Sequence, residues 1–194
     1  MKTDLQDQRV RITKMMIRDA FLHLLRQKPL NKITVRELCE QAQINRGTFY
    51  THYMDVYDLM EQTTNELLAE FRTALSALSE HANTLKSNYD ICKAVFTILK
   101  NNQQLCVILL SDYSNKYIID KFNEMGKKLF LDVYTSLFPK ASQQKLENYY
   151  LFISGGCIAL LRNWLINDDG NTTIDDIALQ ASQIMTDGSK YIFQ

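Results

Sequence analysis

The chain has 194 residues, of which 46% are apolar and 23% charged, so it is long enough to bury a hydrophobic core and too apolar to be disordered. Six glycines and two prolines are too few for a many-turned β protein, which favours long helices. The formal net charge of zero by itself indicates no charged partner.

The charge is unevenly distributed along the chain. Residues 1–53 hold ten Lys and Arg against five Asp and Glu, whereas the remaining residues hold 12 against 17. A basic N-terminal part on an acidic body is the asymmetry expected when one end of a protein meets a polyanion. The same split also arises by chance in many proteins.

Apolar residues recur at helical spacing along most of the chain. The first predicted helix covers residues 9–27. A second begins at Thr34, which Glu37 follows three residues later in the pattern of a capping box. Asn45 is a good N-cap for a short third helix that reaches His52 or Tyr53.

The rest of the chain continues the helical pattern. Asp55 is expected to cap a long fourth helix, which a polar stretch near residues 80–88 ends. Five more helices are predicted, at residues 89–101, 103–112, 115–138, 142–167 and 173–190. The sequence therefore predicts an all-α protein of about nine helices with no strand.

Residues 34–53, TVRELCEQAQINRGTFYTHY, predict a helix, a tight break and a second, short helix. This is the helix-turn-helix pattern, whose second helix enters the major groove of DNA. The short helix carries groups that suit such a surface: the phosphate donors Thr48, Tyr50, His52 and Tyr53, with Arg46 for phosphate or guanine and Gly47 for close approach. Phe49 is expected to point inward as an anchor. Chance spacing in a helical protein, with Tyr and His as plain surface residues, is the alternative.

The segment TVRELCEQAQINRGTFYTHYMDVYDLM closely resembles the DNA-binding domain of the TetR/AcrR family of bacterial transcriptional regulators. The resemblance covers about residues 9–68 and implies a helix-turn-helix domain there, followed by a ligand-binding and dimerisation domain at residues 69–194. It implies a homodimeric repressor that a small-molecule effector releases from a palindromic operator in double-stranded DNA. Carried over by position, the implied DNA-binding residues are Thr34, Arg36, Asn45, Arg46, Gly47, Thr48, Tyr50, His52 and Tyr53.

Two positions depart from the family pattern. Gln43 stands in the turn where the family usually has Gly, so it must adopt or avoid a left-handed conformation that costs about 1 kcal/mol. Val56 stands where the family usually has a Lys that touches phosphate at the start of the fourth helix. We therefore expect that contact to be absent, with Arg9, Arg11 and Lys14 taking part of its electrostatic role.

Residues 148–161 are apolar around the whole helix and include Gly155, Gly156 and Ala159. Such a helix must be covered on more than one side, either by a second chain or by burial within one subunit. The resemblance favours a dimer through about residues 142–190. Aromatic and methionine side chains between residues 89 and 165 can line a ligand cavity, although at this spacing they are more often plain core. They identify no ligand.

Catalysis, metals and membranes find no support in the sequence. His23, His52 and His81 lie far apart, and no nucleophile motif or phosphate-binding loop is present, so we expect no enzyme, no metal and no cofactor. Four scattered cysteines, no N-terminal apolar segment and a longest uncharged run of 14 residues indicate free thiols in a soluble, cytoplasmic protein. Two alternatives stay open: a DNA-binding regulator that answers to a partner protein or to no ligand, and a helical small-molecule binder or enzyme that has lost DNA binding.

Overall fold

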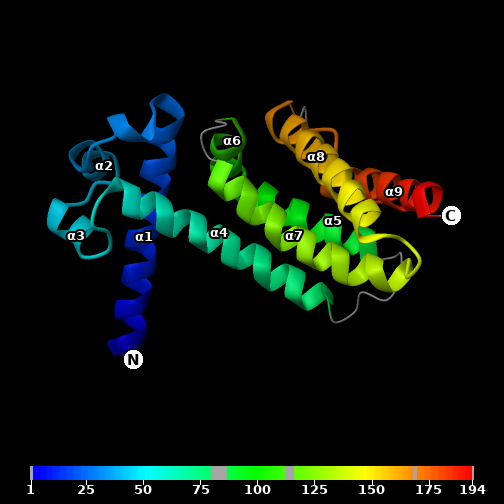
Figure 1. Cartoon of the computed structure of the whole chain (residues 1–194). Coiled ribbons are helices and arrows are strands. Elements are labelled where there is room, and N and C mark those ends of the chain that lie inside the picture. The colour runs from blue at the N-terminus through cyan, green and yellow to red at the C-terminus, as the bar shows by residue number, and fades with distance from the viewer. Residues whose placement is uncertain (1, 80–86, 112–115, 168–169, 194) are drawn as a thin grey trace. The chain divides into compact units, whose positions relative to one another are not determined.

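A computed structural model describes residues 2–79, 87–111, 116–167 and 170–193. Within these ranges the chain forms nine α-helices and a 3₁₀ turn, with no strand, which confirms the predicted all-α fold (Figure 1). The elements are α1 (Lys2–Gln27), η1 (Leu30–Lys32), α2 (Val35–Gln41), α3 (Arg46–Tyr50), α4 (Val56–Ser79), α5 (Ser87–Asn101), α6 (Gln103–Ser111), α7 (Lys116–Leu137), α8 (Gln143–Asn167) and α9 (Ile174–Phe193).

The chain divides into two compact units within α4, between Glu66 and Leu67. We call the part up to Glu66 the head and the part from Leu67 the body. The sequence placed this boundary between residues 68 and 69. The expected break at residues 80–88 falls mostly outside the described residues, as does His81.

The head is organised around one apolar side chain from each of its helices. Phe21 of α1, Leu38 of α2, Phe49 of α3 and Leu59 of α4 are all fully buried in one cluster. Because α2 and α3 are only seven and five residues long, they are too short to be stable alone, and this shared core holds them in place. The inward anchor predicted for Phe49 is confirmed.

The predicted helix starts are also confirmed. The Thr34 hydroxyl accepts a hydrogen bond from the Glu37 amide at 3.3 Å, and the Glu37 carboxylate accepts one from the Thr34 amide at 3.2 Å. Asn45 Oδ1 accepts from the Thr48 amide at 2.7 Å, and Asp55 Oδ1 caps the first turn of α4. Each cap satisfies amides that have no partner inside the helix.

Gln43 adopts the left-handed conformation, with a φ of 54°. Its amide donates to the Glu40 carbonyl at 3.3 Å, and the Ile44 amide donates to the Cys39 carbonyl at 3.0 Å. This pair of bonds is the Schellman motif, which ends a helix with a residue that is usually Gly. The turn between α2 and α3 therefore has the backbone geometry that usually requires glycine, although the residue in the left-handed conformation is Gln43.

The body has its own core, to which α4, α7 and α8 contribute. Phe71 and Leu75 of α4 belong to the same buried cluster as Phe130, Tyr134 and Tyr149. The rings of Phe130 and Tyr134 are stacked, with centroids 4.0 Å apart. Helix α5 packs along α9, and α7 packs along α8.

Helix α8 is buried on one side only. Tyr149, Tyr150 and Ile153 are buried, whereas Leu151 and Phe152 are 65% and 76% exposed. The alternative of a helix wholly buried in one subunit is therefore wrong for this chain. Among the described residues, α8 is the one helix long and apolar enough to cross a membrane, a test that core helices of soluble proteins also pass.

We predict that Gln43→Gly raises the free energy of unfolding by about 0.5–1 kcal/mol, because glycine relieves the left-handed strain but loses more chain entropy on folding. Urea unfolding measures this change. Gln43→Ala is the control, since alanine keeps the strain. An alanine variant as stable as the glycine variant would contradict the argument.

Candidate nucleic-acid interface and ligand cavity

The head places eight of the nine predicted DNA-binding residues at its surface. Thr34, Arg36, Asn45, Arg46, Gly47 and Tyr50 are exposed, and Thr48 and His52 are half-buried. Phe49 anchors α3 from below, so the polar groups of this short helix face outward together. The arrangement fits a surface for a polar partner.

Tyr53 is the exception, because its side chain is only 5% exposed. Its ring lies 5.6 Å from that of Phe49, four residues earlier, and the Lys14 ammonium lies 5.9 Å above it. Burial raises the pKa of its phenol. Tyr53 is a core residue of the head, and we remove it from the candidate interface.

Several polar groups at the tip of α3 already have partners within the head. Asn45 Oδ1 accepts from both the amide and the hydroxyl of Thr48, at 2.7 and 3.0 Å. A Cβ added to Gly47 would lie 3.3 Å from the same oxygen, so the glycine also protects this cap. The Thr34 hydroxyl donates to Glu37 at 2.8 Å. The Asn45 amide nitrogen makes no hydrogen bond to any residue that the structure describes.

The cations of the motif differ in how far they are neutralised. Arg36 pairs with Glu40 at 2.8 Å, and the hydrogen bond that the guanidinium donates to this carboxylate raises the Arg36 pKa. Lys28 pairs with Glu37 at 2.6 Å, and that bond lowers the Glu37 pKa. Arg46 forms no ion pair with any described residue, so its full charge stands at the exposed tip of α3.

The start of α4 adds two exposed side chains that sequence reasoning missed. Met54 is 79% exposed and Tyr57 is 55% exposed, while Val56 between them is 6% exposed and packs in the head core. Val56 therefore offers no side chain to a ligand of this surface. Val56 is the apolar residue that the helical pattern places in the core, so its neighbour Tyr57 could have been predicted to point outward.

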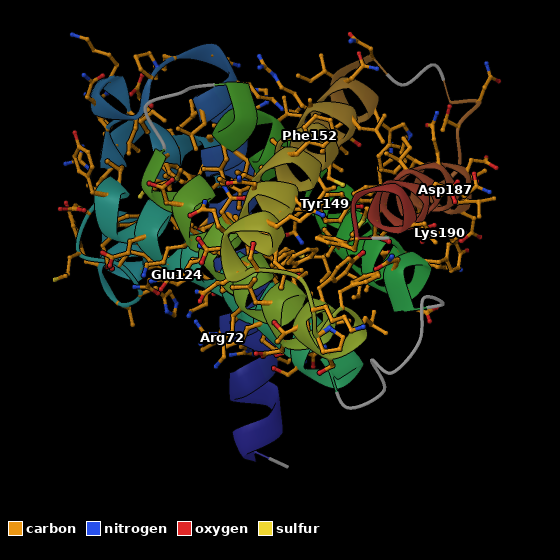
Figure 2. The ribbon with its side chains drawn as sticks, turned by 45° about the vertical axis from the view of Figure 1, so that its right-hand side comes forward. Arg72, Glu124, Tyr149, Phe152, Asp187 and Lys190 are labelled. Atoms are coloured by element: carbon orange, nitrogen blue, oxygen red, sulfur yellow. The ribbon has the colours of Figure 1, made fainter. Side chains whose placement is uncertain are left out.

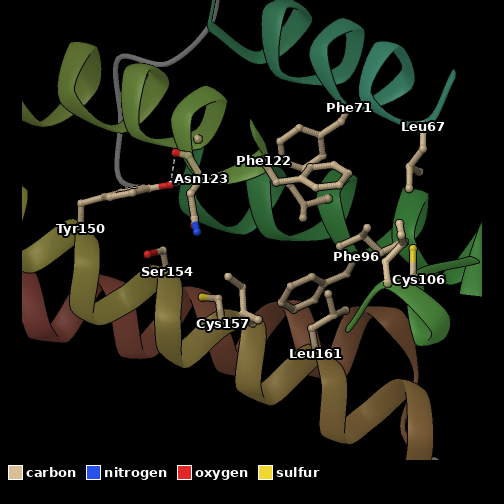
Figure 3. A pocket seen from close by; sticks show the side chains of 15 residues that line it. Leu67, Phe71, Phe96, Cys106, Phe122, Asn123, Tyr150, Ser154, Cys157 and Leu161 are labelled. Atoms are coloured by element: carbon tan, nitrogen blue, oxygen red, sulfur yellow. Dashed lines mark hydrogen bonds between the residues drawn. The ribbon is translucent and has the colours of Figure 1, made fainter. Parts of the chain in front are cut away.

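The body contains two adjoining cavities, with volumes of about 160 and 150 Å³. Both are lined by Phe71, Val95, Phe96, Gly126, Tyr150, Ser154 and Cys157. Figure 3 shows the first cavity between α4, α7 and α8, with side chains from all three helices pointing into it. Apolar cavities that lie between helices are places where proteins commonly bind small molecules.

A glycine makes room for the central phenol of these cavities. Tyr150 Oη donates to the Asn123 carbonyl at 2.7 Å and would lie 2.8 Å from a Cβ added to Gly126. Any larger residue at position 126 would push the phenol away. The sequence indicated that aromatic and methionine residues of this region can line a cavity, although such residues are more often plain core, and it could not say which of them do.

Comparison with known proteins identifies the family. A TetR-family model described as the C-terminal region of transcriptional regulators matches residues 86–187, more than half of the chain. The chain belongs to this family of transcriptional regulators.

A curated relative, described as the uncharacterized HTH-type transcriptional regulator YxbF of Bacillus subtilis, is 29% identical over 72 residues. The match covers 37% of this chain and 19% of that protein.

Solved structures of regulators share the fold. The fatty acid degradation regulator FadR of Bacillus halodurans aligns with a TM-score of 0.70 at 16% identity, covering 91% of this chain and 95% of that one. FadR of Bacillus subtilis, solved in complex with stearoyl-CoA, also gives 0.70, at 15% identity and with 90% and 98% coverage. At these identities the likeness concerns the fold alone.

We predict that Tyr50→Phe and His52→Ala each weaken binding to an operator and to random DNA alike, by about tenfold, because phosphate contacts carry little sequence information. Fluorescence anisotropy with both DNAs measures the effect. Tyr89→Phe, a body tyrosine that bonds Asp175, is the matched control. A changed base preference with intact non-specific affinity would contradict the assigned phosphate role.

Proposed function

We propose that this chain is a cytoplasmic, homodimeric, DNA-binding repressor that a small molecule releases from a palindromic operator. The observation that carries the proposal is the outward polar face of α3, held by the buried Phe49 and tipped by Arg46, which forms no ion pair within the described part of the chain. A reading helix needs both features, because it must be rigidly anchored and present donors to bases and phosphates. Membership of a family of transcriptional regulators supports this reading.

The exposed side of α8 supports the dimer. It carries a stripe at helical spacing, formed by Phe152, Gly155, Gly156, Ala159, Asn163 and Ile166. A Cβ added to Gly155 or Gly156 would meet no atom within 4 Å, so nothing in the described chain requires these glycines. Each costs about 1 kcal/mol of helix propensity relative to Ala, which a close helix of a second chain would offset.

Helix α9 also has exposed apolar side chains. It lies beside α8, as Figures 1 and 2 show, and leaves Leu179 and Ile184 about half exposed. Figure 2 labels Phe152 on α8 and the Asp187–Lys190 pair, 3.1 Å apart, near the end of α9. In a dimer built on this face, two reading helices would bind half-sites about one DNA turn, roughly 34–36 Å, apart.

The cavities support control by a small molecule. They are enclosed by apolar side chains of several helices, including Phe71 and Leu75 of α4. A ligand releases DNA only if it binds the DNA-free conformation more tightly than the DNA-bound one. The stearoyl-CoA in the Bacillus subtilis FadR complex supports the idea that a body of this fold can hold a long apolar group.

Salt dependence tests the DNA side of the proposal. Because each neutralised phosphate releases condensed counterions, log affinity should fall linearly with log salt concentration, by about 0.9 per contact. We expect a steep slope for the wild type, and a slope shallower by about one unit per head for Arg46→Gln if the guanidinium lies on phosphate. Arg72→Gln, an exposed arginine of the body, is the control and should leave the slope unchanged. If the affinity of the wild type for DNA did not depend on salt concentration, the proposed function would be wrong.

The oligomeric state tests the dimer. Gly156→Trp should give a monomer, because a large side chain would hold the partner helix away, while the open space at this position lets the chain itself fold normally. Sedimentation equilibrium measures the mass, and thermal unfolding by circular dichroism checks the fold. Thr135→Trp, at an exposed position of α7, is the control and should remain dimeric. A wild type that is monomeric at micromolar concentration would rule out the model with two half-sites.

A further inference from the structure

The two cavities of the body together form a space that runs along more than two helical turns. Leu67 and Leu161 line only the first cavity, and Leu75 and Ile153 line only the second. On both α4 and α8 these end residues are eight positions apart, about 12 Å along the helix axis. A single occupant of both cavities would therefore be elongated.

The space offers no charge to an occupant. None of the described residues that line either cavity is Asp, Glu, Lys, Arg or His. Burial raises the pKa of Tyr150 and of Cys92 to about 12, and it also raises the pKa of Cys157, so the phenol and thiols stay neutral near pH 7. A carboxylate or phosphate placed here would lose its hydration without gaining a counter-charge.

Two places in the wall are polar. In the second cavity the Asn88 amide already donates to the Tyr134 hydroxyl at 3.2 Å and to the Thr186 hydroxyl at 3.1 Å. The other polar place lies in the first cavity. Asn123 of α7 and Ser154 of α8 line the first cavity on either side of the Tyr150 phenol (Figure 3). The Asn123 side-chain amide makes no hydrogen bond to any described residue, and its nitrogen points into the space between the helices. The Ser154 hydroxyl already donates to the Leu151 carbonyl at 3.3 Å, so the Asn123 amide is the donor of this pair that lacks a partner in the described part of the chain.

We propose that this space binds an uncharged, elongated and mainly apolar molecule, with one hydroxyl, ester or ketone oxygen that accepts a hydrogen bond from the Asn123 amide. The inference rests on the proposed function, since it names the chemical class of the effector. It follows from the length of the apolar walls, from the lack of a charged side chain among the described lining residues, and from the Asn123 amide, which has no hydrogen-bond partner among the described residues. An occupant with a charged group inside the cavity is excluded by the same features.

The test compares ligands that differ only in charge. The full-length protein is loaded with the neutral fluorescent probe N-phenyl-1-naphthylamine, which is then displaced by methyl decanoate, decan-1-ol or decanoate at pH 7.5. The two neutral compounds should displace the probe at concentrations at least about tenfold lower than decanoate. Equal or tighter binding of decanoate, or no binding of any neutral compound, would overturn the proposal.

Two variants separate the polar contact from simple partitioning into an apolar space. Asn123→Leu keeps the size of the side chain but removes the donor, so the affinity for decan-1-ol should fall about five- to tenfold while the affinity for the apolar probe stays the same. Asn101→Leu, at the exposed end of α5, is the matched control and should change neither. An unchanged affinity for decan-1-ol in Asn123→Leu would show that the amide does not bind the ligand oxygen.

The same compounds distinguish this inference from the proposed function. DNA affinity is measured separately, with and without each compound. A neutral compound could bind the cavity as expected and leave the DNA affinity unchanged. This result would contradict the part of the proposed function in which a ligand releases DNA, but it would agree with the inference about the ligand. Release of DNA by decanoate at concentrations where decan-1-ol has no effect would support the function and overturn the inference.

Discussion

The continuity of α4 is the constraint on which the rest of the molecule depends. Over 24 residues this one helix contributes Val56 and Leu59 to the core of the head and Phe71 and Leu75 to the core of the body. Its backbone hydrogen bonds make it stiff along the axis, and packed cores do not deform continuously. One helix therefore belongs to both cores, and the boundary between the head and the body falls inside a helix rather than in a loop. In the proposed function, α4 is the continuous element through which an effector bound in the body would influence the head.

Local chemistry made the head predictable from sequence. The caps at Thr34, Asn45 and Asp55 depend on side chains that bond to amides two or three residues away, so sequence spacing alone indicates them. The same reasoning failed for Tyr53, because spacing shows which residues share a face and not how deeply that face is buried. Its ring packs on Phe49 one helical turn earlier, and a tyrosine can bury its ring as readily as expose it.

The cavity depends on contacts that sequence spacing cannot show. Tyr150 and Gly126 are 24 positions apart, and only the packing of α7 on α8 places the phenol where a Cβ would be. In the same way, Gly188 makes room for the Tyr149 phenol, 3.0 Å from an added Cβ. Aromatic residues at helical spacing therefore predicted an apolar interior, but not which of them border empty space.

The four glycines of α7, α8 and α9 divide into two classes with different causes. At Gly126 and at Gly188, the hydroxyl of a tyrosine from α8 occupies the space that a Cβ would need. Packing within one chain therefore explains why these two residues are glycines. Gly155 and Gly156 face open space on the other side of α8, where a helix gains nothing from glycine unless another backbone approaches. One helix thus bears the ligand cavity on one side and the proposed dimer face on the other. In the proposed dimer, a change in how Tyr150 packs against α7 would act on the helix that also forms the proposed interface, so effector binding and the spacing of the two heads would depend on the same element.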